Sequence, residues 1–137
     1  MSAHENKAIL VRLAEEFNRG NLGIVDEIFS PNLRIISPSP DWPPFPDGVE
    51  GARVMLSAMR EAGVEMKIED IIAEDDRVAV RWTTTGMYRG EPKPGYPKPG
   101  EKVTYGNIAF YRIVNGKIDR DWGVDIMSPT HDPWRSK

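Results

Sequence analysis

The sequence predicts an α+β domain in which helices come first and an antiparallel sheet follows. Two observations support this fold class. In the first half, apolar residues recur every three or four positions, which is typical of amphipathic helices. In the second half, segments rich in β-branched and aromatic residues are separated by turn signals. At 137 residues the chain has the length of one domain, so a single domain over residues 1–137 is expected.

Three helices are expected in the first half. The first covers residues 2–19, because Ser2 and Glu5 have the spacing of a capping box and Gly20 follows as a stop signal. The other two show the same apolar periodicity and cover residues 22–29 and 50–62. The second helix has to end before Pro31, because the proline ring is poorly tolerated inside a helix.

Five strands are expected, over residues 32–37, 66–73, 77–88, 102–113 and 117–126. The last four follow one another as an antiparallel meander, and the Asn115-Gly116 pair is typical of a tight hairpin turn. Two segments rich in proline and glycine, residues 38–48 and 90–100, are expected to be loops. The first of them carries Trp42 and Phe45 among its prolines.

Composition excludes several classes of function. The chain has no cysteine, and its two histidines, His4 and His131, lie near opposite ends, so no metal centre is expected. With 18 basic and 21 acidic residues and no concentrated positive segment, nucleic acid is not expected as a partner. No apolar run approaches the roughly 20 residues of a membrane span, and the first ten residues are too charged for a secretory signal. A cytoplasmic protein is therefore expected, whose carboxylates do most of any proton chemistry.

Several local strings, in their order along the chain, carry a resemblance to a known family. They are FNRGN (17–21), IFSP (28–31), GVEG (48–51), DRVAVRW (76–82) and YRIVNGKI (111–118). Together with the order of the elements, they resemble the SnoaL-like polyketide cyclases of the nuclear-transport-factor-2-like superfamily, over nearly the whole chain. The resemblance implies a cone, in which a curved antiparallel or mixed sheet wraps around three N-terminal helices and encloses an apolar pocket.

The resemblance also implies acid–base chemistry without a cofactor. Cyclases of this family close a polyketide ring by intramolecular aldol condensation, using a pocket aspartate and a neighbouring histidine. Related epoxide hydrolases use two aspartates and an arginine to activate water. Relatives commonly dimerise through the outer face of the sheet, so a homodimer is expected here as well.

The family's catalytic positions carry different residues in this chain. Counted from the Asn115-Gly116 turn, the position of the family's aspartate falls on Gly123, and that of the histidine falls on Ala109. Asn107 shares the face of Ala109; it can donate a hydrogen bond to a substrate oxygen but cannot act as a base. The usual pair of aspartate and histidine is therefore not encoded.

Two neighbouring aspartates are the candidate catalytic residues. The strand period of two places four residues on one face: Asp119, Asp121, Gly123 and Asp125. A bulge near Gly123 would bring Asp121 or Asp125 into the family's position. Two interpretations of Asp121 stay open, because alternation does not show which face is inside. It is either a base whose pKa is raised by apolar walls or a solvated carboxylate beside Arg120.

The residues expected to line the substrate pocket are Trp42, Trp82, Tyr105, Ala109, Tyr111 and Gly123. The competing interpretation is structural: tryptophans are more often core residues than substrate platforms, and tyrosine hydroxyls more often reach solvent or a backbone partner. Arg81, unusual within a strand, is expected to pair with a carboxylate in a structural role.

The sequence therefore predicts a SnoaL-like small-molecule enzyme, a cyclase, isomerase or hydrolase acting on an apolar carbonyl-bearing or cyclic substrate. Asp121 or Asp125 is its expected acid or base, and Asn107 orients an oxygen. The alternative is a non-catalytic binding domain for an apolar small molecule, which Ala109 and Gly123 favour. Ile108 and Phe110 lie on the face opposite Asn107 and would be available to a symmetric partner.

Overall fold

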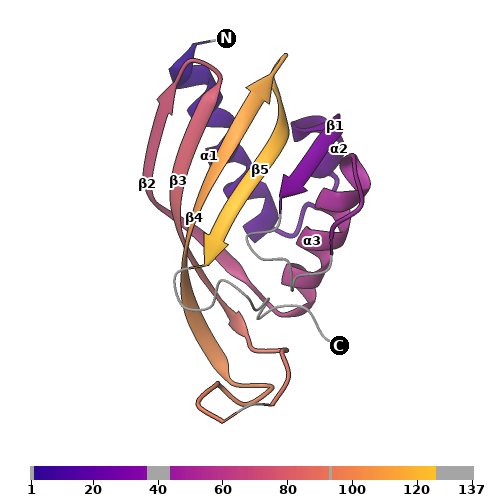
Figure 1. The fold of residues 1–137 in the computed structure, drawn as a ribbon, viewed down its shortest axis with the longest axis vertical. Helices are drawn as coiled ribbons and strands as arrows, with labels where there is room; N and C mark the ends of the chain where they lie inside the picture. The colour runs from indigo at the N-terminus through magenta and orange to yellow at the C-terminus, as the bar shows by residue number, and fades with distance from the viewer. Residues whose placement is uncertain (1, 37–43, 93, 126–137) are drawn as a thin grey trace.

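The computed structural model describes residues 2–36, 44–92 and 94–125 (Figure 1). Their elements are, in chain order, α1 (Ala3–Asn18), α2 (Ile24–Ile28), β1 (Phe29–Ile36), α3 (Val49–Glu61), β2 (Glu65–Glu74), β3 (Arg77–Met87), β4 (Lys102–Val114) and β5 (Lys117–Asp125). The predicted α+β class is confirmed, and so is the order of the elements.

The start of α1 follows the predicted capping box. The backbone N–H of Glu5 donates to Ser2 Oγ at 3.1 Å, and the backbone N–H of Ser2 donates to Glu5 Oε1 at 3.2 Å. The helix ends before Gly20, whose φ of +86° is a conformation that glycine adopts without strain. Its apolar stripe packs on the sheet, and the Asn18 side chain bonds both the backbone N–H and the carbonyl oxygen of Met66 in β2.

The strand β1 begins three residues earlier than predicted. Phe29, expected to end the second helix, already has the extended conformation (φ −97°, ψ 142°) and is buried. Pro31 therefore lies inside the strand rather than before it. Its pairing with β5 is irregular between Phe29 and Arg34, so a residue without a backbone N–H is tolerated there.

The sheet of the described residues has the order β1-β5-β4-β3-β2. β1 pairs with β5 in parallel, and the other pairs are antiparallel, so the sheet is mixed. The helices lie on one face: α1 contacts β2 and β3, while α3 contacts β1 (Figure 1). We call this the concave face and the opposite one the outer face. The ends of β3 and β4 that lead into their connecting loop extend beyond the helices.

The core lies between the helices and the concave face. Leu10, Phe17 and Leu56 of the helices are buried, as are Val78 and Val80 of β3. The outer face instead exposes several large apolar side chains. None of the helices in the described part of the chain is long and apolar enough to cross a bilayer.

Candidate functional site

The candidate residues of β4 and β5 meet on the concave face. The antiparallel register places Tyr111 opposite Asp121 and Ala109 opposite Gly123. Residues directly opposite in antiparallel strands project to the same side of the sheet. Tyr111, Ala109 and Asp121 are all buried, with exposed fractions of 5%, 2% and 7%. Asp121 is therefore buried on the concave face, so the interpretation as a solvated carboxylate is wrong, and the role of Asp121 as a base stays a prediction.

The bulge in β5 lies before Asp121 and not near Gly123. The register shifts between Arg112 and Ile113 of β4, so that Arg112 pairs with Arg120 while Ile113 pairs with Ile118. The extra residue is Asp119. From Asp121 to Asp125 the pairing with β4 is regular.

Because of this bulge, the prediction that Asp119 shares the face of Asp121 is wrong. A bulge places two successive residues opposite one partner, which interrupts the alternation of side chains. Asp119 instead accepts two hydrogen bonds from Arg112, from Nε at 2.8 Å and from Nη2 at 2.7 Å. It takes no part in the candidate site.

The carboxylate of Asp121 lies in a dry environment. Burial disfavours its charged form and raises its pKa from 3.8 to about 7, and desolvation is the only cause of the shift. On the β1 side its partner in the register is the apolar Ile35. A carboxyl group with a pKa near neutrality is well matched to proton transfer at neutral pH.

Gly123 leaves a notch between Asp121 and Asn107. A Cβ atom built on Gly123 would lie 3.8 Å from Asp121 Oδ1, 3.7 Å from Asn107 Nδ2 and 3.9 Å from the Cβ of Ala109. Because glycine has no such atom, the carboxylate and the amide border the same small space. The notch therefore brings a proton acceptor and a hydrogen-bond donor to one point.

The side chains of Trp82 and Tyr111 are joined on the concave face. The indole Nε1–H of Trp82 donates to Tyr111 Oη at 2.9 Å. The expectation that the tyrosine hydroxyl reaches solvent or a backbone partner is therefore wrong for Tyr111. Alternation relates residues within one strand, so it did not place Trp82 of β3 and Tyr111 of β4 on one face. It could not reveal the bond, because in the register Trp82 lies opposite Asn107 and Tyr111 lies opposite Val78.

The remaining sequence predictions divide into three groups. Tyr105 is buried on the concave face, as expected of a lining or core residue. Arg81 pairs with Asp70 at 2.7 Å on the surface, which confirms its structural pairing. Trp42 and His131 lie outside the described residues, and only the backbone of Asp125 is described, opposite Asn107.

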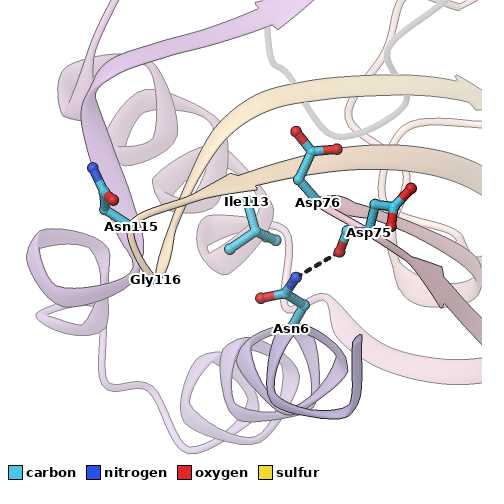
Figure 2. Close-up of a pocket in the computed structure, with 6 residues that line it drawn as sticks. All are labelled: Asn6, Asp75, Asp76, Ile113, Asn115 and Gly116. Carbon is cyan, nitrogen blue, oxygen red and sulfur yellow. Dashed lines mark hydrogen bonds between the residues drawn. The ribbon is translucent and has the colours of Figure 1, made fainter. Parts of the chain in front are cut away.

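A separate hollow of about 210 Å³ lies at the turn ends of the strands (Figure 2). It is lined by Asn6, Asp75, Asp76, Ile113, Asn115 and Gly116. The side-chain N–H of Asn6 donates to the backbone oxygen of Asp75 at 3.0 Å, and its Oδ1 has no hydrogen-bond partner among the described residues. This polar hollow contains none of the predicted pocket residues, and no pattern in the sequence predicted it.

No group of three or more histidine, cysteine or acidic side chains in the described ranges is arranged to hold a metal ion. The chemical groups gathered on the concave face are a carboxylate of raised pKa, an amide and a phenol. These groups can exchange a proton and donate hydrogen bonds to the oxygen atoms of a small molecule.

The chain belongs to the SnoaL-like polyketide cyclase family, whose profile matches residues 8–128. This membership supports a small-molecule role of the cyclase or isomerase type. No curated protein matches the chain.

Solved structures share the fold. AclR from Streptomyces galilaeus, a proposed hydroxylase, is 26% identical to this chain with a TM-score of 0.70. The match covers 93% of this chain and 83% of the AclR chain. TsrD from Streptomyces laurentii is 20% identical with a TM-score of 0.75, and the match covers 100% of this chain and 99% of the TsrD chain. A SnoaL-like polyketide cyclase from Agrobacterium tumefaciens is 19% identical with a TM-score of 0.73, covering 93% and 94%.

Proposed function

We propose that this protein is an enzyme that uses Asp121 for acid–base chemistry on an apolar carbonyl-bearing or cyclic small molecule. The observation that carries the proposal is the buried Asp121 carboxyl group beside the notch over Gly123. Its pKa of about 7 leaves a substantial fraction ionised at neutral pH, and the ionised group is a stronger base than an ordinary aspartate. The cyclase family to which the chain belongs supports the same class of chemistry.

The proposed reaction begins with a proton on a carbon next to a carbonyl group. Asp121 takes this proton, and the electron pair of the C–H bond moves into the carbonyl group to form an enolate. The Asn107 amide, which borders the same notch, donates a hydrogen bond to the enolate oxygen. The enolate carbon then attacks a second carbonyl carbon of the same molecule, and protonated Asp121 returns the proton to the new alkoxide.

The first step can be tested without knowing the natural substrate. A panel of cyclic and acyclic β-dicarbonyl compounds is incubated with the protein in D₂O, and deuterium uptake at the central carbon is followed by NMR. Asp121→Asn keeps the shape of the side chain and removes the base, so exchange above the buffer rate falls by about 10²-fold or more. The matched control is Asp119→Asn, an equally buried aspartate of the same strand that lies outside the site. Equal exchange by Asp121→Asn and the unmodified protein would refute the role of Asp121.

The second candidate function is binding of an apolar molecule without catalysis. The cross-strand pair Ala109 and Gly123 favours it, because neither side chain carries a functional group at the centre of the proposed site. In this case members of the panel quench the fluorescence of the tryptophans, among them Trp82, while no compound exchanges deuterium faster than in buffer.

We further propose that two copies associate through the outer face. Ile72, Ile108 and Phe110 expose 69%, 43% and 53% of their surface there, and a second copy would cover these side chains. Sedimentation at micromolar concentration then gives a dimer, and Phe110→Asp gives a monomer. A monomer for the unmodified protein would contradict this assignment.

A further inference from the structure

Tyr111 is a buried titratable residue to which the proposed reaction gives no task. Only 5% of its surface is exposed, and its strand partner is Asp121. Its hydroxyl oxygen accepts the indole N–H of Trp82 at 2.9 Å. A phenol that accepts one hydrogen bond still has its own hydrogen to donate. The direction of that hydrogen matters for the neighbouring carboxylate.

The order of the strands places Tyr111 between the strands that carry Trp82 and Asp121. β4, which carries Tyr111, lies between β3 and β5. Trp82 reaches the phenol from β3, and Asp121 stands on β5. Because the oxygen accepts the indole N–H, the hydroxyl hydrogen is directed to another side of the oxygen. On the β5 side stands Asp121, directly across from Tyr111 in the register.

We propose that Trp82 and Tyr111 are positioning residues, which turn the O–H dipole of Tyr111 toward Asp121 and stabilise its carboxylate form. The inference deepens the proposed function, because the ionised Asp121 is the base of the proposed reaction. The effect of Tyr111 on the charge of Asp121 can be measured in the free protein, without a substrate.

The electrostatics of the pair agree with this arrangement. Burial raises the pKa of Tyr111 well above 10, and the negative charge of Asp121 raises it further, so the phenol stays a neutral donor. Donation from the indole polarises the O–H group and makes it a stronger donor. In the described part of the chain no cationic side chain contributes to the titration of Asp121. Ile35 faces it from β1, and Arg112 binds Asp119 instead.

The test is the titration of Asp121, followed through the ¹³C signals of the aspartate carboxyl groups. The Asp121→Asn variant identifies the signal. In the unmodified protein the midpoint is expected at about pH 7. Tyr111→Phe removes only the hydroxyl group and is expected to raise this midpoint by a fraction of a pH unit, because the O–H dipole acts on the carboxylate across space and not through a direct hydrogen bond. Trp82→Phe frees the hydroxyl to rotate and raises the midpoint by a smaller amount.

The control is Tyr88→Phe, which removes another buried hydroxyl group, one that donates to the backbone oxygen of Glu91. It leaves the Asp121 midpoint unchanged. An unchanged or lowered midpoint in Tyr111→Phe overturns the proposal, because a phenol that only fills space has no effect on the charge. Where Tyr111→Phe fails to fold, the double variant Trp82→Phe/Tyr111→Phe removes donor and acceptor together, leaves no buried N–H unpaired, and is judged by the same midpoint.

The outcomes also separate this inference from the proposed enzyme. A raised midpoint in Tyr111→Phe, in a protein that exchanges no deuterium with any compound, supports the positioning pair and contradicts the enzyme. An unchanged midpoint, in a protein whose exchange depends on Asp121, supports the enzyme and contradicts the positioning pair. If both hold, the acid-side limb of the pH–rate profile, where the rate rises as Asp121 ionises, moves to higher pH with the midpoint in Tyr111→Phe.

Discussion

Asp119 and Asp121 lie two residues apart on β5, are equally buried at 7% exposure, and have opposite electrostatics. The pKa of Asp119 is lowered, first by the hydrogen bonds from Arg112 and then by the nearby positive charges. The pKa of Asp121 is raised to about 7 by desolvation alone. Equal exposure of the two residues therefore does not give equal charge states, because Asp119 has the Arg112 guanidinium as its partner, whereas Asp121 is desolvated without a cationic partner among the described residues.

The bulge at Asp119 creates this difference. It inserts one residue before Asp121, so Asp119 meets Arg112 and Arg120, at 2.7 and 3.7 Å, while Asp121 stays on the concave face opposite Tyr111. Without the bulge, both carboxylates would project to the same side. One irregularity thus separates a structural ion pair from a candidate base.

The largest expected effect that tests this comparison is the pH dependence of stability through Asp121. Its pKa is about 7 in the folded state and near 3.8 in the unfolded chain, so the folded protein binds more protons between these values. The contribution of Asp121 to stability is therefore full below about pH 4 and is lost as the pH rises through 7. A difference of about three pH units corresponds to a loss on the order of 4 kcal/mol.

Asp121→Asn removes this titration. In urea denaturation at pH 4, 6 and 8, the free energy of unfolding of the variant is then expected to lack the fall with pH that Asp121 causes. The variant therefore becomes more stable than the unmodified protein at pH 8. Asp70→Asn, an exposed aspartate paired with Arg81, keeps the slope of the unmodified protein. If Asp121→Asn keeps that slope as well, the carboxyl group is ionised in the folded state and the contrast with Asp119 disappears.

The second expected effect is a loss of stability at neutral pH, opposite in sign to the gain expected from Asp121→Asn. Asp119→Asn removes the charge from a pair with two short hydrogen bonds, so it is expected to destabilise the protein by about 1–3 kcal/mol at neutral pH. Because the pKa of Asp119 is lowered, its contribution is present above its usual range and is lost as the pH falls. The cost of the variant is therefore smaller in acid.

A double-mutant cycle with Arg112→Gln isolates the interaction. If the pair carries the effect, Asp119→Asn costs much less stability once Arg112 has been replaced. Additive effects of the two substitutions would show that Asp119 contributes through something other than Arg112.

The order of the elements could be predicted from the sequence because each depends on local signals. The capping box at Ser2 and Glu5 and the turn at Asn115-Gly116 lie within a few residues of what they determine. The alternation of β4 likewise predicted Ile108 and Phe110 opposite Asn107, and both are exposed. The start of β1 was not predicted, because a buried apolar residue such as Phe29 fits the end of an amphipathic helix as well as the start of a strand.

The candidate site could be predicted only in part, because it depends on contacts between strands. Alternation grouped Asp121 with Gly123, but a bulge depends on the register with β4, and this hid the separate position of Asp119. The bond from Trp82 to Tyr111 joins two strands at positions that are not opposite each other. No short-range pattern in the sequence encodes it.

The smallest expected effect on stability, and the sharpest test of the notch, comes from Gly123→Ala. The added methyl group would meet its neighbours at 3.7–3.9 Å, which is ordinary contact, and the backbone there is not left-handed. Stability therefore changes by less than about 1 kcal/mol. The methyl group nevertheless occupies the space between Asp121 and Asn107, so deuterium exchange falls although both polar groups are intact. Undiminished exchange in this variant would place the chemistry away from the notch, whereas a lower rate with unchanged stability would locate the reacting carbon directly over Gly123.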